Sequence, residues 1–245
     1  MIRNHAPLVI AEQVVNLSLL HPGRIDLGLG RSGGSEPATD AKLRRTIVEY
    51  GSFEDDVAET LYYLDQLRAA DVETIILAGS GDTARFAGRH GLGLAVAGHI
   101  APAGMDEAIA SYRAAFRPGP ARARPRVVLC LPILIADSEE EAVWWFRSVQ
   151  QRYLDRLRTG GAPMRSPHDA DLDWSASERY RVDAMLDAAL VGSTASVFAQ
   201  LRNISSRWSP DEVMAMSDLP DAAMTMNSHV RLADVTSATE PSLSR

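Results

Sequence analysis

Cysteine and lysine are almost absent from this chain of 245 residues, and aromatic side chains make up only 6% of it. The single cysteine, Cys130, excludes an internal disulfide and favours a reducing compartment, so we expect a cytoplasmic protein. Cys130 lies within an apolar run, which is typical of a core residue rather than of a nucleophile. The only lysine is Lys42, and arginine supplies the other cationic side chains.

Long apolar runs and metal-ligand spacings are lacking as well. No segment is apolar over the length that a bilayer-spanning helix needs, and no signal peptide is visible. The six histidines are scattered without the spacing of metal ligands, so we expect no metal site. A net charge of −7 argues against nucleic acid or an anionic membrane as the main partner.

Apolar runs alternate with helical patterns along most of the chain, which is typical of a parallel α/β fold. With 46% hydrophobic residues the chain can bury a full core, and we predict one domain over 1–245. Segment 159–180 is rich in glycine, proline and scattered acids, which predicts a mobile excursion. The polar tail, 233–245, is predicted to be frayed.

Five apolar runs have the length of strands, namely 25–30, 74–78, 92–97, 126–135 and 212–217. Five parallel strands cannot close an eight-stranded barrel, because tilt and shear are linked to strand number. The first and last of these runs would then be open edges, and an open edge invites pairing with another copy. We therefore expect a homo-oligomer, a dimer in the simplest case; a remnant of a longer gene is the other interpretation.

Residues 79–89 follow one of these strands and open with small residues before a helix begins. Glycines and hydroxyls in such a turn leave backbone N–H groups pointing at one spot, which the helix dipole makes attractive to an anion. Ser80 and Thr83 are three residues apart, so both hydroxyls can reach the same oxygens. The pattern predicts a phosphate site at the carboxyl end of a parallel strand. A serine before a helix is also an ordinary N-cap, and that alternative stays open.

A second segment, 16–34, strengthens the phosphate hypothesis. A helix from about Ala6 to Leu20 breaks at Pro22 and Gly23, and a strand then ends in a Gly-x-Gly-Arg sequence. Glycines at the end of a strand allow a flat ligand to approach closely, and the guanidinium of Arg31 is a fork suited to phosphate.

Together these segments resemble the bacterial luciferase-like monooxygenase family, whose members are flavin- or deazaflavin-dependent (β/α)8 barrels. The opening run 4–13 matches the family pattern just after its third strand. The resemblance implies a TIM-barrel type α/β fold and FMN as the cofactor, with deazaflavin F420 the less favoured choice. It makes Arg31 a ligand of the flavin phosphate and Ser80 and Thr83 its hydroxyl donors. The backbone around Gly79 and Gly81 would close this phosphate site.

The resemblance also implies an incomplete barrel, because the family has about three strand–helix units before the segment at which this chain starts. Those units carry the family's catalytic histidine, so we assign no catalytic residue. The implied function is a flavin-dependent monooxygenase that uses reduced flavin and O2 on an unidentified organic substrate. The alternatives are a non-catalytic flavin-binding or assembly subunit and a gene fragment.

Three further features have alternative interpretations. His99, after a strand, is either a proton carrier or a loop residue bonded to backbone, and the second is favoured. The adjacent aromatics Trp144, Trp145 and Phe146 point in different directions on a helix, so they form either core or a subunit interface. The late methionines are explained more simply as core than as an adaptable pocket; they are Met214, Met216, Met224 and Met226.

Overall fold

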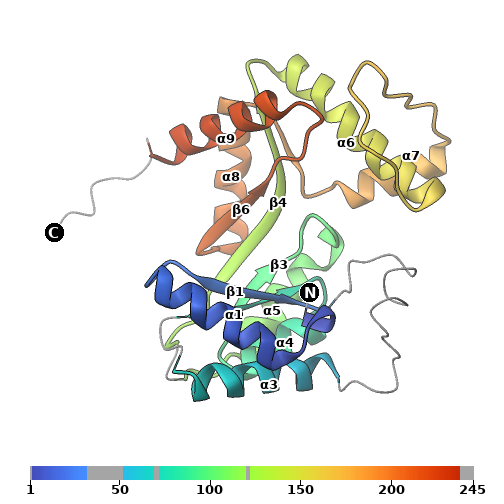
Figure 1. The fold of residues 1–245 in the computed structure, drawn as a ribbon. Helices are drawn as coiled ribbons and strands as arrows, with labels where there is room; N and C mark the ends of the chain where they lie inside the picture. The colour runs from blue at the N-terminus through green and yellow to red at the C-terminus, as the bar shows by residue number, and fades with distance from the viewer. Residues whose placement is uncertain (1, 32–51, 69–71, 120–121, 238–245) are drawn as a thin grey trace. The chain divides into compact units, whose positions relative to one another are not determined.

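A computed structural model describes residues 2–31, 52–68, 72–119 and 122–237 of the chain. The chain divides into two compact units (Figure 1). The N-terminal unit comprises residues up to Val96 together with Glu107–Val127, and the C-terminal unit comprises Ala97–Asp106 and the residues from Val128 onward.

The N-terminal unit contains a parallel sheet whose strand order is β1-β2-β3. Its strands and helices are η1 (Ile2–Asn4), α1 (Pro7–Leu20), β1 (Asp26–Gly30), α3 (Phe53–Gln66), β2 (Glu73–Ala78), α4 (Gly81–Arg89), β3 (Gly93–Val96) and α5 (Met105–Ala115). Strand β2 is a continuous apolar run in which Ile75 and Ile76 are buried. Such a run is expected of a strand in a parallel sheet that is covered on both faces. In this unit α4 packs on β2 and β3, and α1 packs on α3 (Figure 1).

Register in this sheet places the ends of neighbouring strands side by side. Gly30 of β1 pairs with Leu77 of β2, and Ala78 of β2 pairs with Val96 of β3. Since all the strands are parallel, the residue after β1 and the turn after β2 emerge at the same edge of the sheet. Arg31 and Gly79 are those residues.

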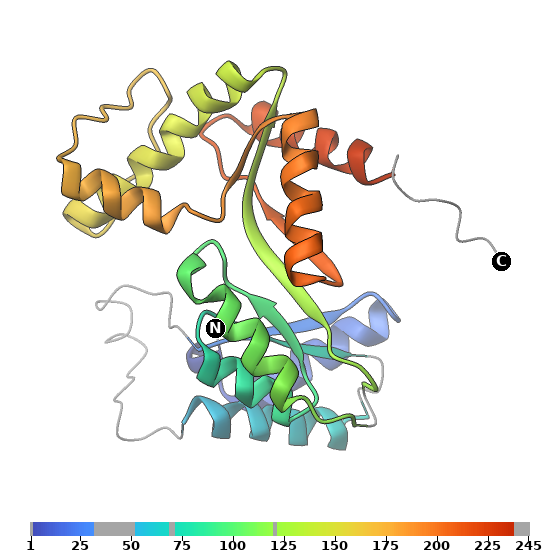
Figure 2. The ribbon, with the colours of Figure 1, turned by 180° about the vertical axis from the view of Figure 1, so that it is seen from behind.

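The C-terminal unit is organised around the long strand β4, which lies beside α8 and β6 in both views of the ribbon (Figure 2). Its elements are η2 (Pro102–Gly104), β4 (Val127–Ala136), α6 (Glu139–Thr159), α7 (Ala176–Met185), β5 (Leu190–Ser193), α8 (Thr194–Trp208), β6 (Glu212–Met216) and α9 (Ala222–Ser237). The first half of β4 pairs in parallel with β6, from Val128 opposite Glu212 onward. The second half pairs in parallel with β5, from Ile133 opposite Leu190 onward.

The predicted fold class, an incomplete (β/α)8-type α/β fold, is confirmed. All the strand pairs within the two units are parallel, and helices connect the strands. Within the described ranges there are six strands rather than the five counted from the sequence, and the additional strand is β5. Its sequence ends in Gly192 and Ser193, so only Leu190 and Val191 contribute apolar side chains to the strand.

Two predicted boundaries differ in detail. Segment 159–180 is irregular only up to Trp174, because Ser175 caps α7 through a reciprocal bond with Glu178 and so starts the helix earlier. At the other end, α9 extends to Ser237, so the first residues of the predicted tail are helical; the rest of the tail lies outside the described residues. Across the described helices, none is both long and apolar enough to cross a bilayer.

Candidate phosphate site

Arg31 directly follows β1, at the same sheet edge as the turn after β2. Its guanidinium lies 5.9 Å from the centre of the Phe53 ring, and its Nη2 lies 3.4 Å from Oε1 of Glu54. The Phe53 ring in turn packs edge-to-face on Phe86 of α4, at 6.2 Å. The Arg31 side chain is 57% exposed, so the pair with Glu54 is a weak surface ion pair that a phosphate can replace.

Ser80 is the N-cap residue of α4, and its hydroxyl makes no capping bond. Four other serines cap helices in the described parts of the chain, and each of their hydroxyls accepts the backbone N–H three residues on; they are Ser52, Ser138, Ser175 and Ser193. The Ser80 hydroxyl instead lies 3.5 Å from the Thr83 hydroxyl. The sequence could not distinguish a cap from a ligand, and the geometry leaves this helix start without a side-chain cap.

Thr83 is buried although its hydroxyl is polar, and it lies in the first turn of α4. The first intrahelical bond here runs from the Ala84 N–H to the Ser80 carbonyl, so the amides that precede it are the orphan donors of a helix start. These donors, two hydroxyls and the positive end of the helix dipole are therefore gathered within one turn.

Gly81, the first residue of α4, is in close contact with Glu107. A Cβ atom at Gly81 would lie 2.6 Å from Oε1 of Glu107, so this carboxylate touches the helix start. A carboxylate is favourable at a helix N-terminus, and it is also a like charge for any phosphate that binds there. This neighbour could not be predicted from local sequence, because Glu107 belongs to α5, which is distant from Gly81 in the chain.

The structure thus brings Ser80, Thr83, Gly79 and Gly81 together around one turn, and it places Arg31 at the end of the adjoining strand. The guanidinium is engaged by Phe53 and Glu54, which sequence reasoning missed. The capping box of Ser52 and Asp55 indicates where the helix that contains Phe53 and Glu54 begins, but the contact of these residues with Arg31 depends on tertiary packing.

His99 lies in the C-terminal unit and its ring nitrogen Nδ1 is 3.4 Å from the carbonyl oxygen of Cys130. Burial lowers the pKa of His99 from its usual value, which favours the neutral ring. The contact agrees with the favoured interpretation of a loop residue bonded to backbone. Cys130 is buried in β4, and burial raises the pKa of its thiol to about 11, as expected of a core residue.

The adjacent aromatic residues are partly buried, and the late methionines are divided between the core and the surface. Trp144 packs against the rings of Trp145 and His168, so segment 159–174 partly covers it. Met224 is buried in a core cluster with Leu134 and Leu219, whereas three of the four late methionines are exposed. The core explanation therefore holds for Met224; Met214, Met216 and Met226 are more than 40% exposed.

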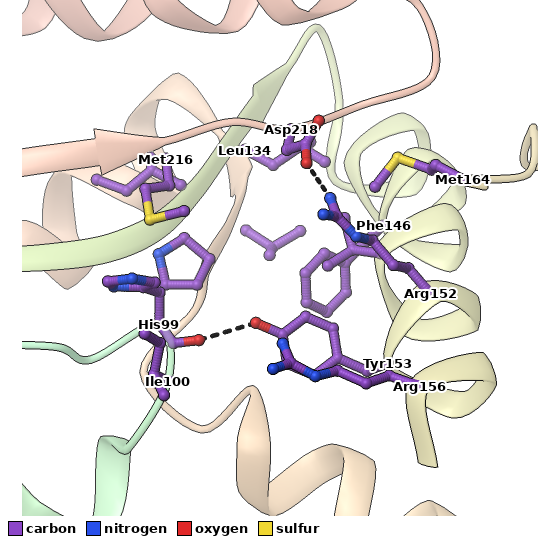
Figure 3. Close-up of a pocket in the computed structure, with 14 residues that line it drawn as sticks. His99, Ile100, Leu134, Phe146, Arg152, Tyr153, Arg156, Met164, Met216 and Asp218 are labelled. Atoms are coloured by element: carbon purple, nitrogen blue, oxygen red, sulfur yellow. Dashed lines mark hydrogen bonds and ion pairs between the residues drawn. The ribbon is translucent and has the colours of Figure 1, made fainter. Parts of the chain in front are cut away.

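A cavity of about 220 Å³ lies in the C-terminal unit and was not foreseen from the sequence (Figure 3). The strands β4, β5 and β6 supply its apolar wall, and α6 supplies Phe146, Val149, Arg152, Tyr153 and Arg156. These α6 residues recur every three or four positions and so share one helix face. The Tyr153 hydroxyl donates a 2.9 Å hydrogen bond to the His99 carbonyl, which ties α6 to the loop after β3.

No group of three or more His, Cys, Asp or Glu side chains is arranged to hold a metal ion in the parts of the chain that the structure describes.

The luciferase-like monooxygenase family matches residues 1–208. The chain is 36% identical over 248 residues to the uncharacterized protein YvbT of Bacillus subtilis, and 35% identical over 249 residues to a luciferase-like monooxygenase of Escherichia coli. Each match covers 96% of this chain and 74% of the relative. The chain therefore belongs to the luciferase-like monooxygenase family, and the resemblance stated from its motifs is confirmed.

Solved structures share the fold. The apo form of MsnO8 matches with a TM-score of 0.74 and 25% identity, over 98% of this chain and 76% of that one. An oxygenating constituent of 3,6-diketocamphane monooxygenase from Pseudomonas putida, solved with FMN, matches with a TM-score of 0.64 and 16% identity, over 96% and 76%. A coenzyme F420-dependent reductase of Methanopyrus kandleri matches with a TM-score of 0.58 and 13% identity, over 91% and 77%.

Proposed function

We propose that the chain is a flavin-dependent monooxygenase that binds the phosphate of FMN at the start of α4. The observation that carries the proposal is the N-cap Ser80, whose hydroxyl leaves the helix uncapped and lies beside that of Thr83. Family membership supports an oxidoreductase in general. The FMN complex of the diketocamphane enzyme supports FMN, and the F420-dependent reductase keeps the deazaflavin as the second choice.

The residues present fit a phosphate. Arg31 would supply a charge-assisted fork, the hydroxyls of Ser80 and Thr83 would donate to phosphate oxygens, and the first amides of α4 would complete the set. Gly79 and Gly81 would let the backbone approach closely. A bound reduced flavin supplies the electrons with which O2 is activated for insertion of one oxygen atom into the substrate. No catalytic residue is assigned.

The enzyme is tested by supplying reduced FMN and O2 with a panel of organic substrates. We expect a product that carries one added oxygen atom and depends on the protein, and we expect Thr83→Val to lower its yield. Thr83→Val is nearly isosteric, so an undiminished yield would contradict the site. Hydrogen peroxide as the only product would instead favour the alternative, a non-catalytic flavin-binding or assembly subunit.

We further propose that the protein is a dimer and that it resides in the cytoplasm. A reducing compartment suits its single free cysteine. Helix α1 exposes apolar side chains, with Leu19 and Leu20 more than 70% exposed, and among the described strands β1 is paired on one side only. A stable dimer would bury about 2,000 Å² or more. Light scattering should show a dimer that Leu20→Glu weakens and that Gln13→Glu, on the same helix, does not. A compact monomer at micromolar concentration would contradict this.

A further inference from the structure

The cavity beneath α6 has the character of a site for an amphipathic ligand. Most of its wall is apolar, and the side chains that form it include Leu134, Phe146, Val149 and Val191. Two methionines, Met164 and Met216, also line it, and their flexible thioethers adapt to ligands of different shape. The volume of about 220 Å³ is far above the roughly 10–15 Å³ that one water molecule needs, so the cavity has room for an aliphatic chain with a head group.

Charge at the cavity is positive. Its charged lining residues are Arg152, Arg156 and Asp218, and burial of His99 favours a neutral ring. Arg152 is paired with Asp218, as Figure 3 shows, so one arginine charge is balanced. Arg156 makes no ion pair with any residue that the structure describes, which leaves a net charge of +1 at the mouth.

The neighbour of the Arg156 guanidinium at the cavity is Tyr153. Figure 3 shows Arg156 beside the ring of Tyr153. Burial raises the pKa of the Tyr153 phenol, and the positive charges of Arg156 and Arg152 oppose that rise. Tyr153 is itself held by its hydrogen bond to the His99 carbonyl. Arg156 therefore stands beside a fixed aromatic side chain at one end of an apolar cavity (Figure 3).

We infer that this cavity binds a medium-chain aliphatic carboxylate, with the chain against Phe146 and Val149 and the carboxylate on Arg156. A guanidinium matches a carboxylate as a bidentate donor, and the apolar wall matches the chain. The inference does not depend on flavin, because all of the residues named here lie in the C-terminal unit and none belongs to the proposed phosphate site.

The experiment measures binding of octanoate to the full chain by titration calorimetry, with 1-octanol as the ligand that has the same chain and no charge. We expect octanoate to bind more tightly than octanol. Arg156→Gln should weaken octanoate about tenfold and leave octanol unchanged. The matched control is Arg202→Gln, an exposed arginine of α8 that does not line the cavity, and it should change neither ligand.

A second pair of variants tests the location of the chain. Val149→Trp fills the cavity and should abolish binding of both ligands; should it fail to fold, Met164→Trp blocks the same space from the irregular segment after α6. Absence of octanoate binding by the unmutated protein would overturn the inference. Binding that survives the filled cavity, or that Arg202→Gln weakens as much as Arg156→Gln does, would overturn it equally.

Discussion

The Ser80 hydroxyl lies 3.5 Å from the Thr83 hydroxyl, in the first turn of a helix that no side chain caps. A serine in this position normally accepts the N–H of the third helical residue and so stabilises the helix by about 1 kcal/mol. At α4 that stabilisation is forgone. The arrangement favours a ligand at this helix start, because an oxygen of the ligand can then accept the backbone N–H that the Ser80 hydroxyl does not.

This difference between serines can be measured directly. Ser80→Ala should change the free energy of unfolding by less than about 0.5 kcal/mol, because no capping bond is lost, and should weaken FMN by roughly threefold to tenfold. Ser138→Ala removes a working cap on α6 and should cost about 1 kcal/mol without affecting FMN. Urea denaturation and fluorescence titration report the two quantities. Equal stability losses for both variants would show that Ser80 is an ordinary cap.

Glu107 should weaken phosphate binding, because its carboxylate touches the first residue of the same helix. Replacing it with glutamine removes a like charge near the phosphate. We expect Glu107→Gln to tighten FMN severalfold, with riboflavin unaffected, and the gain to shrink at high salt because the group is exposed. A matched control is Glu59→Gln, on the exposed side of α3, which should leave both ligands unchanged. Weaker FMN binding by Glu107→Gln would contradict the placement of the phosphate.

Two glycines of α4 should differ in how much alanine destabilises the protein. A Cβ at Gly88 would lie 2.6 Å from the Tyr112 carbonyl oxygen, and this backbone cannot move without shifting α5. Gly88→Ala should therefore cost about 1–3 kcal/mol or more. At Gly81 the close atoms belong to the flexible end of Glu107, which can rotate away, so Gly81→Ala should cost less than about 1 kcal/mol. Thermal unfolding compares them, and equal losses would refute the tight α4–α5 packing.

The free energy of unfolding should depend on pH partly through the titration of His99. Because burial lowers its pKa in the folded state, protonation favours the unfolded chain. The contribution of His99 is complete above about pH 6.5 and is lost as the pH falls through that value toward the folded pKa. The wild-type protein should lose more stability between pH 7.5 and 5.5 than His99→Asn, which keeps an N–H near Nδ1. Identical pH profiles would mean that the ring is not buried.

Much of the N-terminal unit was predictable from local sequence. The helix over Pro7–Leu20 has a proline at its start and a Pro-Gly break after it, and the strand over Glu73–Ala78 is a continuous apolar run. The proximity of the Ser80 and Thr83 hydroxyls could be predicted for the same reason. Local patterns of this kind depend on few neighbouring residues, so they can be recognised without knowledge of the tertiary packing.

Other features depend on contacts between distant residues, and the sequence does not reveal them. The approach of Glu107 to Gly81 and of Phe53 to Arg31 depends on helix packing. Strand β5 was missed because only two of its four residues, Leu190 and Val191, have apolar side chains, and its pairing with Ile133–Ala136 supplies what its own sequence does not. The cavity beneath α6 needed three strands and a helix to be placed together.

The most direct test of the phosphate site compares FMN with riboflavin, which differ by the phosphate alone, on the unmutated chain and on Arg31→Ala. A charge-assisted bidentate contact contributes about 1.5–3 kcal/mol, so the variant should lose roughly tenfold to a hundredfold in FMN affinity and little in riboflavin affinity. Equal losses for the two ligands, or an unmutated chain that binds neither, would contradict the proposal that Arg31 and the start of α4 hold the flavin phosphate.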